Sequence, residues 1–154
     1  MNKKLLIVYH SKSGNTLKMA RAAFKGAAHK EITGVDSKLI QAKEATANDL
    51  LWADGLIIGT AENFGYMSGG LKDFFDRTFY EVEGKIQPLP YAILISAEND
   101  GTGALSSIRR IAKGYPFVEV QEPVINLGKL EDPTLGKCQD IGTAMAAGLE
   151  AGIY

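Results

Sequence analysis

Short apolar runs alternate with amphipathic segments along the whole chain. Runs such as "LLIV", "LIIG" and "AILI" are continuously apolar, as strands are when a sheet is covered on both faces. The run that precedes the last helical segment is interrupted near Pro123. The pattern predicts strands at 4–9, 35–40, 56–59 and 91–97, and a fifth strand broken into 117–120 and 124–127.

Helical periodicity fills the segments between these runs. The clearest helix carries apolar residues at spacings of three and four: Leu71, Phe74, Phe75, Thr78, Phe79 and Val82. In the first helix, 15–28, the predicted buried face consists of Leu17, Ala20, Phe24, Ala27 and Ala28. Two further helices are expected at 46–53, with Thr46 as N-cap, and at 103–113. Asp132-Pro133, an N-cap followed by proline, opens the last helix.

Five strands alternating with five helices predict a parallel sheet with helices on both faces, which is a three-layer α/β sandwich. In such a sheet ligands bind beyond the carboxyl ends of the strands, at the switch in strand order. The loops at that edge are 10–16, 60–68 and 96–103. All three are rich in small and polar residues, whereas the connections at the opposite edge resemble ordinary turns.

Composition limits the class of protein. With 154 residues and 45% hydrophobic content, we expect one domain over residues 1–154. The apolar runs are too short to cross a bilayer, and the first residues match neither a signal peptide nor an anchor. Cys138 has no second cysteine to pair with, which suits a reducing compartment. We therefore expect a soluble cytoplasmic protein that does not enter a membrane.

Charge is unevenly distributed, although the net charge is only -1. Residues 1–30 carry seven Lys or Arg and no acid, while residues 54–100 carry eight acids against three bases. A basic first helix can indicate nucleic-acid binding. No aromatic residues alternate with these bases and no nucleic-acid motif accompanies them, so a solvated helix face is the better interpretation.

The first loop, Ser11-Lys12-Ser13-Gly14-Asn15-Thr16, has the composition of an anion site. It offers three hydroxyl groups and a glycine, and the helix that follows adds unpaired N–H groups and its positive dipole end. A phosphate monoester is the occupant that we expect. The alternative is that these residues only cap the helix.

Other phosphate-handling classes fit the chain poorly. A nucleoside triphosphate loop needs Gly-Lys-Ser/Thr, whereas Asn15 follows Gly14. The nearest match to a dinucleotide fingerprint, Gly101-Thr102-Gly103, follows the fourth strand and lacks the final glycine. Cys138 lies in the last helix, not in the phosphate loop as a cysteine-based phosphatase requires. A phosphorylation receiver needs acids after the first strand, where this chain has Tyr9-His10. The phosphate is therefore expected to be held without being cleaved.

The second and third loops suit a planar ring with a polar edge. The second, "GTAENFGYMSGGLKDFFDR", combines glycine turns with Phe64, Tyr66 and Met67, whose side chains can lie on a flat heteroaromatic ring. The alternative is that these aromatic residues cover the core. The third, "SAENDGTGAL", offers backbone amides to the edge of a ring but contains no aromatic residue.

These stretches resemble the flavodoxin family, near its branch of multimeric flavodoxins and NAD(P)H:quinone oxidoreductases. "SKSGNT" is similar to the hydroxyl-rich phosphate loop of the family. The second loop is similar to the "G-T-P-x-x-F-G-x-M-S-G-x-L-K-x-F-F-D-R" stretch of that branch. The resemblance implies non-covalent FMN and a flavodoxin-like fold, a five-stranded parallel sheet in the order 2-1-3-4-5.

The resemblance also assigns the FMN contacts by position. The phosphate is expected on Ser11, Lys12, Ser13, Gly14, Asn15 and Thr16. The isoalloxazine ring is expected on Ala61, Asn63, Phe64, Gly65, Tyr66 and Met67. The pyrimidine end of the ring is expected on Ala97, Glu98, Asn99, Asp100 and Gly101. No metal ligand and no catalytic side chain is assigned, because the flavin itself performs the chemistry in such proteins.

Several departures from the branch bear on function. Ala61 replaces the usual proline, and the extension that helps to build tetramers is missing. The third loop also lacks the aromatic that covers one flavin face in small electron-carrying flavodoxins. An open flavin face and a nearly neutral surface favour an NAD(P)H-dependent oxidoreductase that reduces a quinone-like acceptor. The alternatives are an electron carrier for a redox partner protein and a flavin-free interaction protein. The oligomeric state is left undecided, with a homodimer as one hypothesis.

Four further side chains near the loops or in the last helix are candidates for a role in the site or in the core. His10 borders the phosphate loop, either as a proton donor near the flavin or, the better interpretation, as a structural strand-end residue. Glu62 and Glu98 are either anions beside the flavin or solvated loop residues. Cys138 shares an apolar helix face and is expected to pack in the core.

Overall fold

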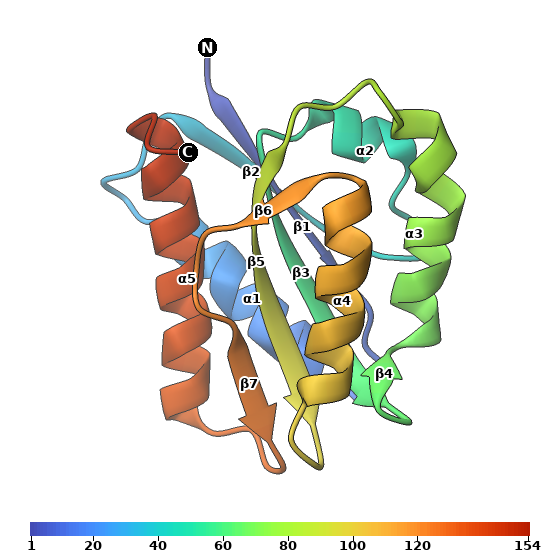
Figure 1. Ribbon diagram of the computed structural model, residues 1–154. Coiled ribbons are helices and arrows are strands. Elements are labelled where there is room, and N and C mark those ends of the chain that lie inside the picture. The colour runs from blue at the N-terminus through green and yellow to red at the C-terminus, as the bar shows by residue number, and fades with distance from the viewer.

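A computed structural model describes residues 1–154 and contains a mainly parallel, twisted sheet (Figure 1). The order of its central path is β2-β1-β3-β5-β6; β7 also pairs with β5, and β4 pairs antiparallel with β3. The strands are β1 (Lys3–Tyr9), β2 (Val35–Gln41), β3 (Gly55–Asn63), β4 (Tyr66–Met67), β5 (Leu89–Ala97), β6 (Phe117–Glu119) and β7 (Val124–Leu127).

The expected five-stranded sheet in the order 2-1-3-4-5 is therefore correct in its path and wrong in its strand count. The predicted break of the fifth strand is confirmed: β6 pairs with the beginning of β5 and β7 with its end. The additional strand, β4, was not predicted. It forms because β3 continues past Gly59 to Asn63 and then folds back on itself.

Helices cover both faces of the sheet, as predicted (Figure 1). On one face, α1 and α5 pack with Leu5, Ile7 and Tyr9 of β1. On the other, α2, α3 and α4 pack with Leu6 and Val8, because successive strand residues point to opposite faces. The helices are α1 (Asn15–Ala27), α2 (Ala47–Trp52), α3 (Gly69–Val82), α4 (Thr102–Gly114) and α5 (Asp132–Glu150). None is long and apolar enough to span a membrane.

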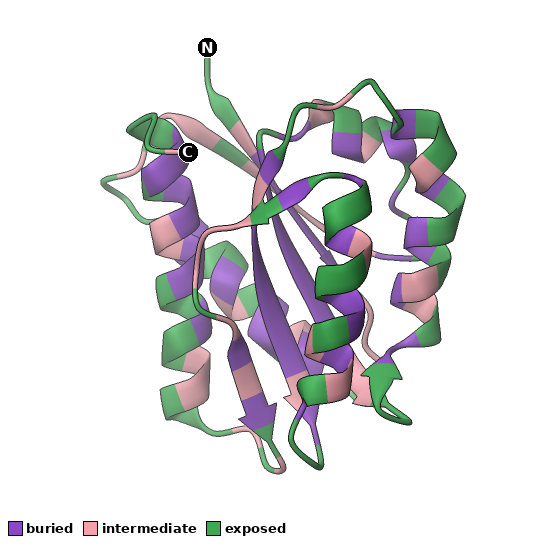
Figure 2. Ribbon diagram, viewed as in Figure 1, coloured by how far each residue is buried: buried purple, intermediate pink, exposed green.

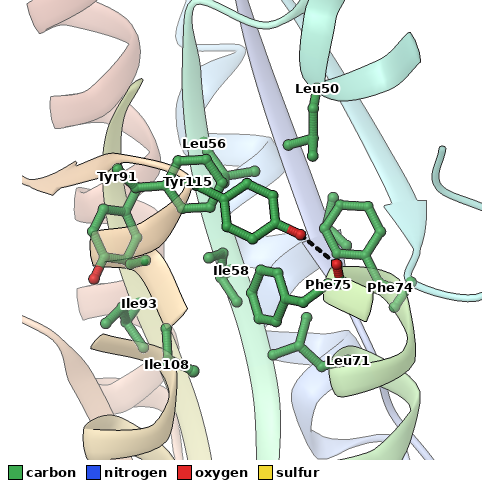
Figure 3. Close-up of a cluster of buried hydrophobic side chains, with 14 of the residues drawn as sticks. Leu50, Leu56, Ile58, Leu71, Phe74, Phe75, Tyr91, Ile93, Ile108 and Tyr115 are labelled. Atoms are coloured by element: carbon green, nitrogen blue, oxygen red, sulfur yellow. Dashed lines mark hydrogen bonds between the residues drawn. The ribbon is translucent and has the colours of Figure 1, made fainter. Parts of the chain in front are cut away.

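The central strands are buried along most of their length (Figure 2). On the α3 side, Tyr115 lies among Phe75, Phe79 and Phe117, and its hydroxyl donates to the carbonyl of Phe75 (Figure 3). This burial raises the pKa of Tyr115 to about 12. The predicted buried face of α3 is confirmed, with Phe79 only partly buried. Cys138 is fully buried, as predicted, and burial raises the pKa of its thiol to about 12.

The contact between α1 and α5 depends on glycines. A Cβ at Gly142 would lie 1.8 Å from the carbonyl oxygen of Ala23, and Thr143 donates to the carbonyl of Gly26 at 2.9 Å. α5 therefore packs on the side of α1 that carries Ala23 and Gly26. The predicted face is partly wrong, because Phe24 and Ala28 are exposed. α5 also begins one residue earlier than predicted, with Glu131 as N-cap and Asp132 in the first turn.

Replacing Gly142 by alanine should test this close approach. The new methyl group must push α1 and α5 apart, so we expect the free energy of unfolding to fall by about 1–3 kcal/mol. Gly136→Ala is the matched control on the same helix, since nothing lies within 4 Å of its Cβ position. There alanine should stabilise the helix by about 1 kcal/mol. Urea unfolding followed by the fluorescence of Trp52 measures both changes, and equal effects at the two positions would contradict the packing described.

Candidate functional site

The three loops that follow β1, β3 and β5 meet at one edge of the sheet, at the bottom of Figure 1. They line a pocket of about 500 Å³. Its lining residues are His10, Ser11, Lys12, Ser13, Thr16, Ala61, Asn63 and Ser96. The prediction that these loops come together is confirmed. Ser96 was not among the predicted ligand contacts, although its place at the end of a buried strand was a usable signal.

The first loop turns sharply into α1. Gly14 has φ 105°, a left-handed conformation that glycine adopts without strain, and its N–H donates to the hydroxyl of Ser11 at 3.1 Å. No side chain caps the N-terminus of α1 and no acid lies in its first turn. By contrast, Ser68 caps α3, and Thr46 forms a capping box with Asp49 on α2. The first amides of α1 are therefore free for an anion.

The predicted phosphate contacts surround these free amides. Thr16 is only 2% exposed, yet it lines the pocket. Its methyl group would lie 3.2 Å from a Cβ at Gly59, so the strand glycine gives it room. Lys12 and Ser13 are exposed and Asn15 is half-buried. An uncapped helix N-terminus, hydroxyl groups and a lysine together fit a phosphate group.

The second loop is a β-hairpin whose two turn residues both have positive φ: Phe64 at 53° and Gly65 at 68°. The side chain of Phe64 is fully exposed and that of Tyr66 is 41% exposed. Met67 differs from them, because its side chain packs in the core and its N–H donates to Ser107 Oγ at 3.1 Å. At the base of the hairpin, Ser68 N donates to the hydroxyl of Thr60 at 3.0 Å, and both side chains are buried.

The third loop is split between exposed and buried residues. Glu98, Asn99 and Asp100 are exposed, whereas Ala97 and Gly101 are buried. Asp100 accepts hydrogen bonds from the backbone N–H and the hydroxyl of Thr102, which lower the pKa of its carboxyl group.

The two glutamates of these loops differ in their surroundings. The carboxylate of Glu62 accepts hydrogen bonds from the backbone N–H groups of Gly101, Gly103 and Ala104. Neither sequence-based interpretation of Glu62 anticipated this contact, since no local signal links residues about forty positions apart. Glu98 forms no hydrogen bond with another side chain and is exposed, as a solvated loop residue would be.

His10 packs tightly against the start of α3. A Cβ at Gly70 would lie 2.2 Å from the imidazole ring, so any other residue there would force the ring to move. The Nδ1 atom of His10 is buried without a hydrogen-bond partner, while the residue also lines the pocket. An unpaired buried polar atom beside a pocket is consistent with a site built for a polar ligand.

A doubly wound parallel sheet in the order β2-β1-β3-β5-β6, with an open anion loop after its first strand, has the arrangement of the flavodoxin-like class. A sequence model of NADPH-dependent FMN reductases matches residues 41–132, more than half of the chain. The chain therefore belongs to the NADPH-dependent FMN reductase family. The matched region includes the second and third loops but not the first loop.

Two curated relatives carry different activities in their names. A flavodoxin of Aquifex aeolicus is 40% identical over 83 residues, covering 54% of this chain and 44% of the relative. An NAD(P)H dehydrogenase (quinone) of Acidithiobacillus ferrooxidans is 33% identical over 93 residues, covering 49% of this chain and 46% of the relative. The matches thus span less than half the length of either relative.

Solved structures agree on the fold over nearly the whole chain. An archaeal flavodoxin superposes with a TM-score of 0.82 and 25% identity, covering 96% of this chain and 99% of the other. A WrbA-like flavodoxin from Agrobacterium tumefaciens gives 0.78 at 19% identity, covering 97% and 99%. The sequence resemblance is confirmed: this is a flavodoxin-like protein that binds FMN.

The phosphate loop can be tested by comparing two ligands that differ only in the phosphate. In the double variant Ser13→Ala, Thr16→Val, valine keeps the methyl group that faces Gly59 and removes the hydroxyl. Each lost hydrogen bond to the charged phosphate should cost about 1.5–3 kcal/mol. FMN should therefore bind much more weakly, while riboflavin affinity stays near that of the unaltered protein. Quenching of flavin fluorescence measures both, and equal weakening of the two ligands would place the phosphate elsewhere.

The hairpin turn should be strained at Phe64, because a bulky residue with positive φ is unfavourable by about 1–3 kcal/mol. Phe64→Asn should relieve the strain, since asparagine tolerates this conformation. We expect the free energy of unfolding to rise by about 1 kcal/mol while FMN affinity falls. The exposed Tyr80, on α3, provides the control substitution Tyr80→Asn. A Phe64→Asn variant that is no more stable than the original protein in urea would contradict the strain.

Proposed function

We propose that this protein is an NAD(P)H-dependent oxidoreductase that passes electrons through FMN to a quinone or a similar acceptor. When bound, FMN supplies the redox chemistry, taking electrons from a nicotinamide and giving them to the acceptor. The work of the chain is then to bind the flavin, orient it and leave one face accessible.

In this proposal the first loop holds the FMN phosphate, through the free amides of α1, the hydroxyls of Ser11, Ser13 and Thr16, and the charge of Lys12. The ring lies against the hairpin and the third loop. Two of the predicted contacts have reduced roles, because the side chain of Met67 packs in the core and the N–H of Gly101 already donates to Glu62. The exposed residues Phe64, Tyr66 and Asn99 are better placed to contact the ring.

The observation that carries the proposal is the absence of an aromatic side chain on the third loop. Exposed aromatic residues at this edge come from the hairpin, as Phe64 and Tyr66, while the third loop presents Glu98, Asn99 and Asp100. A ring held from the hairpin side would keep its other face free for a nicotinamide or a quinone. The family description and the relative named NAD(P)H dehydrogenase (quinone) support this assignment.

A flavodoxin-type electron carrier is the second candidate. It is supported by the Aquifex aeolicus relative, which is named a flavodoxin, and by the archaeal flavodoxin structure that matches almost end to end. Against it stands the net charge of -1, since carriers that dock transiently on partner proteins benefit from a strong surface field of one sign.

One anaerobic experiment separates the two candidates. The FMN-loaded protein is mixed with NADH or NADPH, bleaching of the flavin absorbance is followed, and a quinone is then added. The oxidoreductase should bleach quickly and turn over repeatedly. A carrier should bleach only slowly with both nucleotides and should require a partner reductase.

A variant tests whether the open face matters. Asn99→Trp should slow the bleaching by NAD(P)H while FMN remains bound, because an indole ring on the third loop would cover the free face. Asn48→Trp, on the exposed side of α2, is the control. Unchanged bleaching by the Asn99→Trp variant would mean that the nucleotide approaches from another side.

A further inference from the structure

The carboxylate of Glu62 joins two loops of the site. Glu62 lies near the end of β3, and its partners lie at the start of α4. Oε1 accepts from Gly101 N at 3.3 Å, and Oε2 accepts from Gly103 N at 3.0 Å and Ala104 N at 3.1 Å. The helix N-terminus that follows the third loop is thus filled by an anion of the chain itself.

Two further contacts hold the hairpin against α4. A Cβ at Gly103 would lie 1.9 Å from the carbonyl oxygen of Gly65, so the turn and the first residues of the helix touch backbone to backbone. Beyond the turn, Met67 N donates to Ser107 Oγ at 3.1 Å. The hairpin is therefore attached to α4 both before and after its turn, and β4 lies beside the first turns of α4 in Figure 1.

The turn needs this external support. Phe64 has a positive φ that is unfavourable for an aromatic residue, and its fully exposed side chain makes no compensating contact. The hairpin itself supplies only two pairs, Glu62 with Met67 and Asn63 with Tyr66. A two-stranded hairpin this short is not stable by itself. The hydrogen bonds that Glu62 and Ser107 accept are the polar contacts between the hairpin and α4.

We propose that Glu62 is a positioning residue for the ring side of the FMN site. It holds the hairpin and the third loop as one preformed unit, so that binding the ring does not require ordering two separate loops. It also occupies the N-terminus of α4, which leaves the uncapped N-terminus of α1 as the place for the FMN phosphate. This inference rests on the proposed FMN site.

The decisive comparison is between FMN and riboflavin in four variants, each measured against the unaltered protein. Glu62→Ala should weaken both ligands by the same factor, about tenfold or more, which corresponds to ~1.4 kcal/mol or more. Ser107→Ala removes one neutral tether and should weaken both ligands equally but less. Glu62→Gln keeps the size of the side chain, and its amide oxygen can still accept from Gly103 N and Ala104 N, while its NH₂ group would face the N–H of Gly101. It should therefore weaken both ligands equally but less than Glu62→Ala. Glu81→Gln, exposed on α3, removes the same charge elsewhere and should change neither affinity.

A small anion separates the tie between the two loops from the mere filling of the helix N-terminus. In Glu62→Ala the amides of α4 are free and added formate can bind them, but formate is not bonded to β3 and cannot hold the hairpin. Formate should therefore restore little of the affinity for either flavin. It should have no effect on the unaltered protein or on Ser107→Ala, in which Glu62 still occupies the amides.

The results that overturn the inference differ from those that overturn the FMN site. If the unaltered protein bound FMN at none of the proposed loops, the site itself would be wrong. Suppose instead that the unaltered protein binds FMN normally. Then undiminished binding by folded Glu62→Ala, loss of FMN affinity alone, or full restoration of both affinities by formate would each refute the positioning role of Glu62. Circular dichroism and the fluorescence of Trp52 establish that each variant is folded.

Discussion

Burial of the central strands on both faces is the constraint on which the rest of this structure depends. Because β1, β3 and β5 are covered by helices on either side, their side chains are apolar and no polar ligand can be bound along their length. The parallel arrangement then brings their carboxyl ends to one edge, where the chain must leave the sheet. Polar chemistry is therefore concentrated in three loops, and the pocket of about 500 Å³ lies among them.

The same topology makes α1, α3, α4 and α5 begin at that edge, so that several helix N-termini are close to any anion that enters (Figure 1). The chain satisfies most of them itself. Ser68 caps α3, Glu62 occupies the start of α4, and Asp132 lies in the first turn of α5. Only α1 begins with neither a side-chain cap nor an acid. In the proposed FMN site, the N-terminus of α1 is the place for the phosphate because the N-termini of the other helices at this edge are already occupied.

Much of the fold was predictable from periodicity. The continuous apolar runs identified the buried strands, and the three-and-four spacing identified the buried face of α3. The buried face of α1 was less clear, because an alanine-rich helix has apolar residues on more than one side. There the deciding factor was the close approach of α5 to Ala23 and Gly26, which left Phe24 exposed. β4 was missed because its two residues, Tyr66 and Met67, are too few to form a pattern.

For the site, the sequence by itself determined which loops carry polar residues, that a hydroxyl-rich loop precedes the first helix, and that the third loop has no aromatic side chain. These are local properties, since they depend on residues close together in the chain. The tertiary structure alone decided which groups remain available to a ligand. The N–H of Gly101 and the side chain of Met67 were predicted contacts, yet one donates to Glu62 and the other lies in the core. Gly101 and Glu62 are 39 positions apart in the chain. Only folding brings the donor and the acceptor of this hydrogen bond within 3.3 Å of each other.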